Sequence, residues 1–208
     1  SRRQRQMCIR DRVKTLKAAV VDRREAMQLL MGYNSFNGYV WNKLFDLQLI
    51  RKNDIRFHAD YPACEDTMFV GSYLYHCSRV CVTEECLYCY RQVSGGANRG
   101  RYSGRKAYDP KWMSVFEMTE YMADLYKDDA VTAACRLHEV REAGIVLRSM
   151  EAAGYHGADH ARLKGILRRG AGLFFRDENS GRSQKLSVLL SCISPKLELA
   201  VWKLRNRK

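Results

Sequence analysis

Long apolar segments are missing from this sequence of 208 residues. No run of apolar residues approaches the roughly 20 that a membrane-spanning helix needs. The first residues also lack the apolar h-region of a secretory signal. These absences predict a cytoplasmic chain with reduced cysteines, either soluble or in peripheral contact with the inner face of the cell membrane.

Several short motifs of known chemistry are also absent. The sequence has no G-K-[ST] phosphate loop, no D-x-D acidic pair and no H-E-x-x-H zinc motif. It carries no fingerprint of a nucleic-acid-binding module, so nucleic acid is not expected as a partner. Without metal-ligand spacing, three histidines are predicted to face solvent or to bond locally: His138, His156 and His160.

One cluster among the eight cysteines has spacing close to that of a metal site. Cys77, Cys81, Cys86 and Cys89 form C-x3-C-x4-C-x2-C. A structural zinc site needs four ligands that converge in a tetrahedron, and the first pair is too loosely spaced to favour this. Ordinary buried thiols are therefore expected and no metal ligand is predicted. A zinc-stabilised interaction module remains an alternative.

Positive charge is abundant, with a formal net charge of +13. Residues 1–12 hold five arginines and one aspartate, and they resemble translated sequencing-adapter sequence. We expect them to be a non-native tail, with native sequence starting near Val13. The remaining chain is still basic, which permits an anionic partner such as a nucleotide diphosphate or an anionic membrane. A basic nucleic-acid-binding module without enzymatic activity is the second alternative.

The stretch from residue 38 to residue 69 carries the most informative pattern. It opens on Trp41, Asn42 and Lys43, and it closes on Glu65 and Asp66 just before an apolar segment. Paired carboxylates in that position indicate a helix N-terminus, where free backbone N–H groups and the helix dipole stabilise them. A carboxylate held there at the floor of a cleft could act as a general base.

Four motifs in order carry a resemblance to a known family: W-N-K-L, I-x-F, C-E-D-x-x-F and L-Y-C-Y-R, the last ending at Arg91. Together they resemble the C-terminal half of family 2 glycosyltransferases, over roughly residues 26–97. The resemblance implies an α/β fold, namely the acceptor-side part of a GT-A domain. It also implies transfer of a sugar from a nucleotide-sugar donor to a glycan or lipid-linked acceptor in cell-surface polysaccharide synthesis.

The resemblance further implies roles for individual residues. Asp66 would take the proton from the acceptor hydroxyl in an inverting reaction, and Glu65 would orient the site. Trp41 would offer a platform to the sugar ring, while Asn42 and Lys43 would make polar contacts to the substrate.

Arg91 precedes a glycine-rich, basic segment over residues 92–104. Arg91 is predicted to bind the donor diphosphate, and the segment after it could close over that group, although a solvated connector explains its composition equally well. Mg²⁺ or Mn²⁺ is implied for the parent enzyme, with its ligands in an N-terminal half that we expect to precede this chain. The chain alone is therefore expected to be inactive.

The predicted organisation has three parts: a tail over 1–12, a partial GT-A domain over 13–109 and a helical region over 110–208. Apolar spacing predicts helices over 23–31, 67–75, 112–126, 130–150 and 159–169. Strand-like segments are expected at 55–57 and 80–82. Pro195 should divide the end of the chain into two helices, and the last is basic and amphipathic. It could lie on an anionic membrane or pack on the protein.

Overall fold

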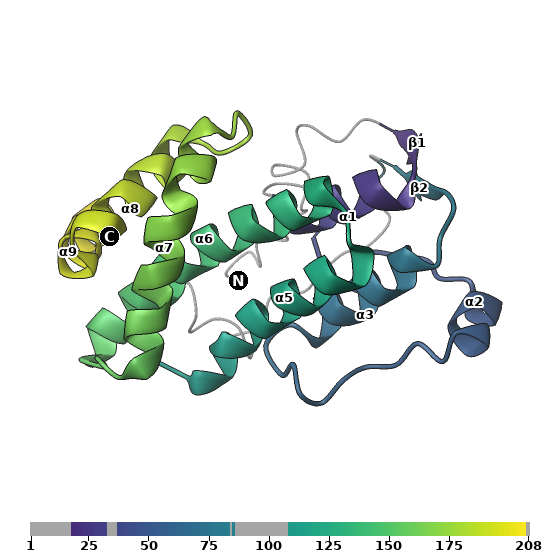
Figure 1. Ribbon diagram of the computed structural model, residues 1–208, viewed down its shortest axis with the longest axis horizontal. Coiled ribbons are helices and arrows are strands. Elements are labelled where there is room, and N and C mark those ends of the chain that lie inside the picture. Colours follow the sequence, from purple (N-terminus) through teal and green to yellow (C-terminus); the bar gives the residue numbers. More distant parts are fainter. Residues whose placement is uncertain (1–17, 33–36, 84, 86–107, 207–208) are drawn as a thin grey trace, which may run out of the picture. The chain divides into compact units, whose positions relative to one another are not determined.

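The computed structural model describes residues 18–32, 37–83, 85 and 108–206 (Figure 1). Helices contain 68% of these residues and strands 4%. The chain divides into two compact units, one formed by residues 1–96 and 120–135 and the other by residues 97–119 and 136–208. The predicted tail over residues 1–12 lies outside the described residues.

The predicted α/β GT-A fold is wrong. In the described part of the chain, the strands β1 (Ala19–Val21) and β2 (Val80–Val82) form a two-stranded antiparallel sheet, with Val20 opposite Cys81. A sheet of two three-residue strands cannot form the central layer of an α/β domain. The strand at 80–82 was predicted correctly, whereas its partner β1 was not foreseen.

The strand expected at residues 55–57 is also absent. The amide of Ile55 donates to the carbonyl of Ile50, 3.1 Å away. The Ile55 side chain is buried with Phe69 and Tyr73 of the helix α3 (Glu65–Tyr75). Packing on α3 therefore buries the apolar side chain that the sequence pattern attributed to a sheet.

The first unit is built around α3 and α1 (Arg23–Met31), which pack together. The helix α1 has the predicted bounds because its ends are specified locally. The Asp22 side chain accepts a hydrogen bond from the amide of Glu25 at 2.8 Å, and Gly32 follows the last turn. The short helix α2 (Leu47–Lys52) begins at Asp46 in the same way.

The second unit is helical throughout its described residues. It contains the 3₁₀ helix η2 (Pro110–Met113), the first part of α5 (Ser114–Tyr126), most of α6 (Asp129–Ala153), α7 (Ala158–Arg176), α8 (Arg182–Ile193) and α9 (Pro195–Arg205). The helices predicted over 112–126 and 130–150 are confirmed to within three residues, but the end predicted at residue 169 is wrong, because α7 continues through Gly170 and Gly172 to Arg176. Pro195 separates α8 from α9 as expected, because proline fits the first turn of a helix but not its interior.

The terminal helix α9 has one face in the core of its unit and another in solvent. Leu199 and Glu198 are buried, whereas Leu197 and Leu204 are exposed beside basic residues. Across the described ranges, no helix has the length and apolar character needed to cross a membrane.

A close approach between α6 and α7 depends on Gly170. A Cβ atom at this position would collide with Cγ2 of Val140, whereas a Cβ atom at Gly172 would meet nothing within 4 Å. We expect Gly170→Ala to lower the free energy of unfolding by about 1 kcal/mol, because overpacking costs about 1–3 kcal/mol and alanine regains at most about 1 kcal/mol of helix propensity.

The same substitution two residues later is the matched control. We expect Gly172→Ala to raise the free energy of unfolding by about 0.5–1 kcal/mol through helix propensity alone. Urea unfolding of both variants measures the two effects. Equal changes at the two positions would show that Val140 does not restrict this helix contact.

Candidate functional site

The loop over residues 38–43 lies against the first turn of α3, so the structure brings the two ends of the predicted motif together. The contact is close at Gly38, where a Cβ atom would collide with the side chain of Thr67. Asn37, just before it, has a φ of 54°, in the left-handed region that asparagine tolerates better than most residues. The Asn-Gly pair thus turns the chain onto the helix start.

Lys43 holds this loop together. Its Nζ atom donates to the carbonyl of Asn37 at 2.6 Å, to the carbonyl of Tyr39 at 2.7 Å and to Oδ1 of Asn42 at 2.8 Å. An ammonium group has three protons to donate, so the loop itself offers an acceptor for each of them. This geometry favours a positioning role for Lys43 over a direct contact with a substrate phosphate.

Electrostatics couples Lys43 to Asp66. Burial lowers the pKa of Lys43 to about 7, and the negative charge of Asp66 acts in the opposite direction by raising it. The coupling means that the two charged groups predicted from separate motifs share one environment. The protonation state of Lys43 can therefore change near neutral pH.

The predicted platform residue Trp41 is half-buried and already stacked. The ring of Tyr39 lies 5.3 Å from it at an interplanar angle of 19°. Tyr39 was not predicted as a site residue, although an aromatic residue two positions before Trp41 was a usable signal. Tyr39 therefore covers one face of Trp41, so the C–H face of a sugar could stack only on the outer face of this pair.

Glu65 and Asp66 occupy the first turn of α3, as predicted. The N-cap residue, Cys64, makes no side-chain capping hydrogen bond. Carboxylates in the first turn are then the groups that interact with the positive end of the helix dipole. The prediction that this acidic pair marks a helix start is confirmed, and its catalytic role stays a prediction.

A packed aromatic cluster fixes the position of α3 relative to the loop. Phe45 meets the rings of Phe69 and Tyr73 edge-on, at centroid distances of 5.4 and 4.9 Å. The hydroxyl of Tyr73 accepts a hydrogen bond from the amide of Asp46 at 2.8 Å. The segment that follows Lys43 is therefore anchored to the same helix that presents Asp66.

Other predicted site features cannot be placed. Arg91 and the segment over 92–104 lie outside the described residues, as do Cys86 and Cys89. Within the described ranges, one group of three metal-ligating side chains converges, and it includes neither Glu65 nor Asp66. With Lys43 beside Asp66, this site does not fit a divalent cation, so the Mg²⁺ or Mn²⁺ ligands of the parent enzyme remain a prediction about residues outside this sequence.

We expect Lys43 to titrate near pH 7, far below the 10.5 of an ordinary lysine. Because its pKa is lower in the folded state, unfolding takes up a proton between these two values, and this group makes stability rise with pH across that window. An NMR titration of the Lys43 side chain measures the pKa. In Asp66→Asn, the loss of the carboxylate charge should lower this pKa further. Titration near 10.5 would contradict the buried environment.

Comparisons with known proteins add no assignment. No family model matches the chain, and neither a curated protein nor a solved structure matches it. The functional interpretation therefore depends on the motifs themselves and on the geometry of the loop, the helix start and the aromatic pair.

Proposed function

We propose that this chain is part of an inverting glycosyltransferase that moves a sugar from a nucleotide-sugar donor to a glycan or lipid-linked acceptor. The observation that carries the proposal is the convergence of Lys43 and Asp66, which are 23 positions apart in the sequence and electrostatically coupled in the structure. The motifs that suggested sugar transfer predicted that these residues serve one site. The stacked pair of Tyr39 and Trp41 on the same loop supports a carbohydrate ligand.

In the proposed reaction, a carboxylate oxygen of Asp66 accepts the proton of the acceptor hydroxyl. The acceptor oxygen attacks the anomeric carbon of the donor, and the bond from that carbon to the nucleotide diphosphate breaks with its electron pair leaving on the diphosphate. This single displacement inverts the anomeric configuration. Trp41 and Tyr39 hold the acceptor sugar, and Lys43 fixes the shape of their loop by donating to the carbonyls of Asn37 and Tyr39.

The experiment is a transfer assay on the longer protein of which we propose this chain is a part. Wild-type protein and Asp66→Asn are incubated with a panel of nucleotide sugars, and released nucleotide diphosphate and glycosylated acceptor are measured. Transfer that requires the Asp66 carboxylate supports the proposal. Absence of transfer with every donor, or transfer that is independent of Asp66, contradicts it.

A further inference from the structure

Three side chains that can bind metal converge where α6 joins α7. Glu151 lies in the last turn of α6, His156 in the connecting loop and His160 in the first turn of α7. Nε2 of His160 is 2.8 Å from Oε1 of Glu151, and Nδ1 of His156 is 3.9 Å from the same oxygen. One ligand atom from each residue lies within 4.8 Å of the other two. We propose that these residues bind a divalent transition-metal ion, with Zn²⁺ the best match.

The connection between the two helices directs His156 back toward Glu151. Gly154 adopts a φ of +68°, a backbone conformation that is unfavourable for residues other than glycine and asparagine. Its amide donates to the carbonyl of Glu151 at 3.2 Å, and the amide of Tyr155 donates to the carbonyl of Met150 at 2.9 Å. These bonds close the end of α6, so the position of the loop is set by backbone geometry and does not depend on the two histidines.

The distances and burial fit a zinc ion. Ligand atoms about 2.0–2.1 Å from a tetrahedral ion lie about 3.3 Å from each other, and the separations of the two histidine nitrogens from Oε1 of Glu151 bracket this value. The Glu151 side chain is 4% exposed and that of His160 is 12% exposed, whereas that of His156 is 48% exposed. A buried carboxylate with two imidazoles is a nitrogen and oxygen ligand set that suits Zn²⁺.

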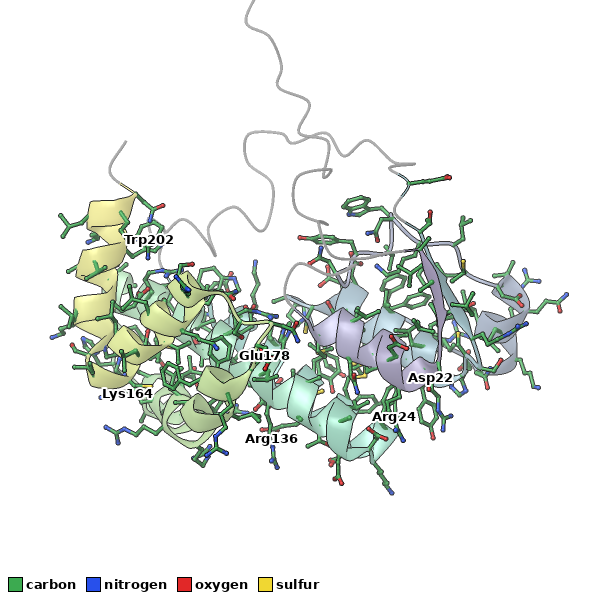
Figure 2. All side chains as sticks on the ribbon, turned by 90° about the horizontal axis from the view of Figure 1, so that it is seen from above. Asp22, Arg24, Arg136, Lys164, Glu178 and Trp202 are labelled. Carbon is green, nitrogen blue, oxygen red and sulfur yellow. The ribbon has the colours of Figure 1, made fainter. Side chains whose placement is uncertain are left out.

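Three protein ligands leave a coordination position for a further group. The same residues line a cavity of about 280 Å³, together with Ile193, Ser194, Pro195 and two lysines, Lys164 and Lys196. Figure 2 shows Lys164 on α7, in the same unit as the ligands. Three ligands and an open position characterise catalytic zinc sites more than structural ones. The lysines weaken binding of a bare cation and favour an anion, such as inorganic phosphate, in the open position.

The competing explanation is that His160 and Glu151 form a hydrogen bond that only joins α6 to α7. His156 distinguishes this explanation from a metal site. Its separation of 3.9 Å from Glu151 is too long for a hydrogen bond, and its side chain is half-exposed, so its loss should not disturb folding. A metal site, in contrast, requires it as a ligand. His156→Gln is therefore the informative variant, and His58→Gln is the control because His58 is an exposed histidine of the other unit.

The experiment titrates the full chain with Co²⁺, follows visible absorption, and then displaces Co²⁺ with Zn²⁺. We expect one ion to bind without the intense thiolate-to-cobalt charge-transfer band that cysteine ligands produce. His156→Gln should weaken binding by at least about 10- to 100-fold, because loss of a group that only supports a ligand already costs that much, while its melting temperature without metal stays that of the wild type. His58→Gln should bind like the wild type.

Three outcomes would overturn this proposal: no Co²⁺ or Zn²⁺ binding, binding that His156→Gln leaves unchanged, or a spectrum accounted for by thiolate ligands alone. The last outcome would instead support the alternative that cysteines, such as the cluster from Cys77 to Cys89, bind the metal. None of these results bears on Asp66, because the metal site and the proposed sugar-transfer site lie in different units.

Discussion

In the longer protein proposed above, an Asp66→Asn substitution is expected to lower kcat for sugar transfer by about 10²- to 10⁴-fold, the usual contribution of a positioned general base. Asparagine has nearly the same shape as aspartate, but its amide cannot accept the proton of the acceptor hydroxyl at neutral pH. The substrate contacts proposed for Trp41 and Asn42 remain, so KM for the acceptor should change little. The loss should therefore appear in kcat.

The control for this effect is Asp60→Asn, which removes an exposed carboxylate six positions earlier in the chain. It makes the same change in net charge, and we expect it to leave kcat unchanged. Circular dichroism of both variants tests whether folding is retained. If the two variants lose activity equally, or if Asp66→Asn raises only KM, Asp66 is not the base.

The second large effect is a loss of stability, which we expect when the buried ion pair between α6 and α9 is broken. Nη1 of Arg148 lies 2.8 Å from Oε1 of Glu198, with side chains 9% and 4% exposed. Ser187 of α8 donates to the same carboxylate oxygen at 2.6 Å. The guanidinium carbon lies 5.0 Å from the ring centre of Trp202, which Figure 2 labels on α9. Three helices of the second unit thus meet at one pair of charges.

We expect Glu198→Leu to lower the free energy of unfolding by about 3–5 kcal/mol, because it leaves the charge of Arg148 buried without its partner. Arg148→Met should cost a similar amount for the reverse reason. The double variant should recover most or all of the loss, since an apolar pair of similar volume avoids the desolvation of two ions. Recovery is favoured further because, among the described residues, Oε2 of Glu198 has no hydrogen-bond partner.

Urea unfolding of the two single variants and the double variant gives the coupling energy between these residues. Arg56→Ala provides the control, because the Arg56–Asp54 pair is exposed on both sides and exposed pairs contribute little. A double variant less stable than both single variants would contradict this account, since it would mean that the ion pair itself is the source of stability.

Helices with strong local signals were predicted well. Asp22 and Gly32 delimit α1, and Pro195 divides α8 from α9, because capping and proline effects act over a few residues. The α/β fold was not predictable in this way. It came from a family resemblance, and a short apolar segment such as the one around Ile55 fits a strand or a packed loop equally well until its partner is known.

The candidate site, too, could be predicted only in part, because some of its contacts depend on the fold. The motifs predicted site roles for Trp41, Asn42, Lys43 and Asp66, but the hydrogen bonds of the Lys43 ammonium within its own loop depend on a geometry that no motif specifies. The group formed by His156, His160 and Glu151 was not predicted, because the H-E-x-x-H motif places both histidines on one helix. Here the ligands come from a helix end, a loop and a helix start.

The sequence by itself determined the bounds of α1, the break between α8 and α9 and the place of the acidic pair of α3, because these features depend on interactions between near neighbours in the chain. Only the tertiary structure decided that Ile55 packs on α3, that Lys43 shares an environment with Asp66 and that Arg148 pairs with Glu198. Each of these contacts joins residues far apart in the sequence. Their energies come from burial and from the low polarity that burial creates, and both exist only once the chain has folded.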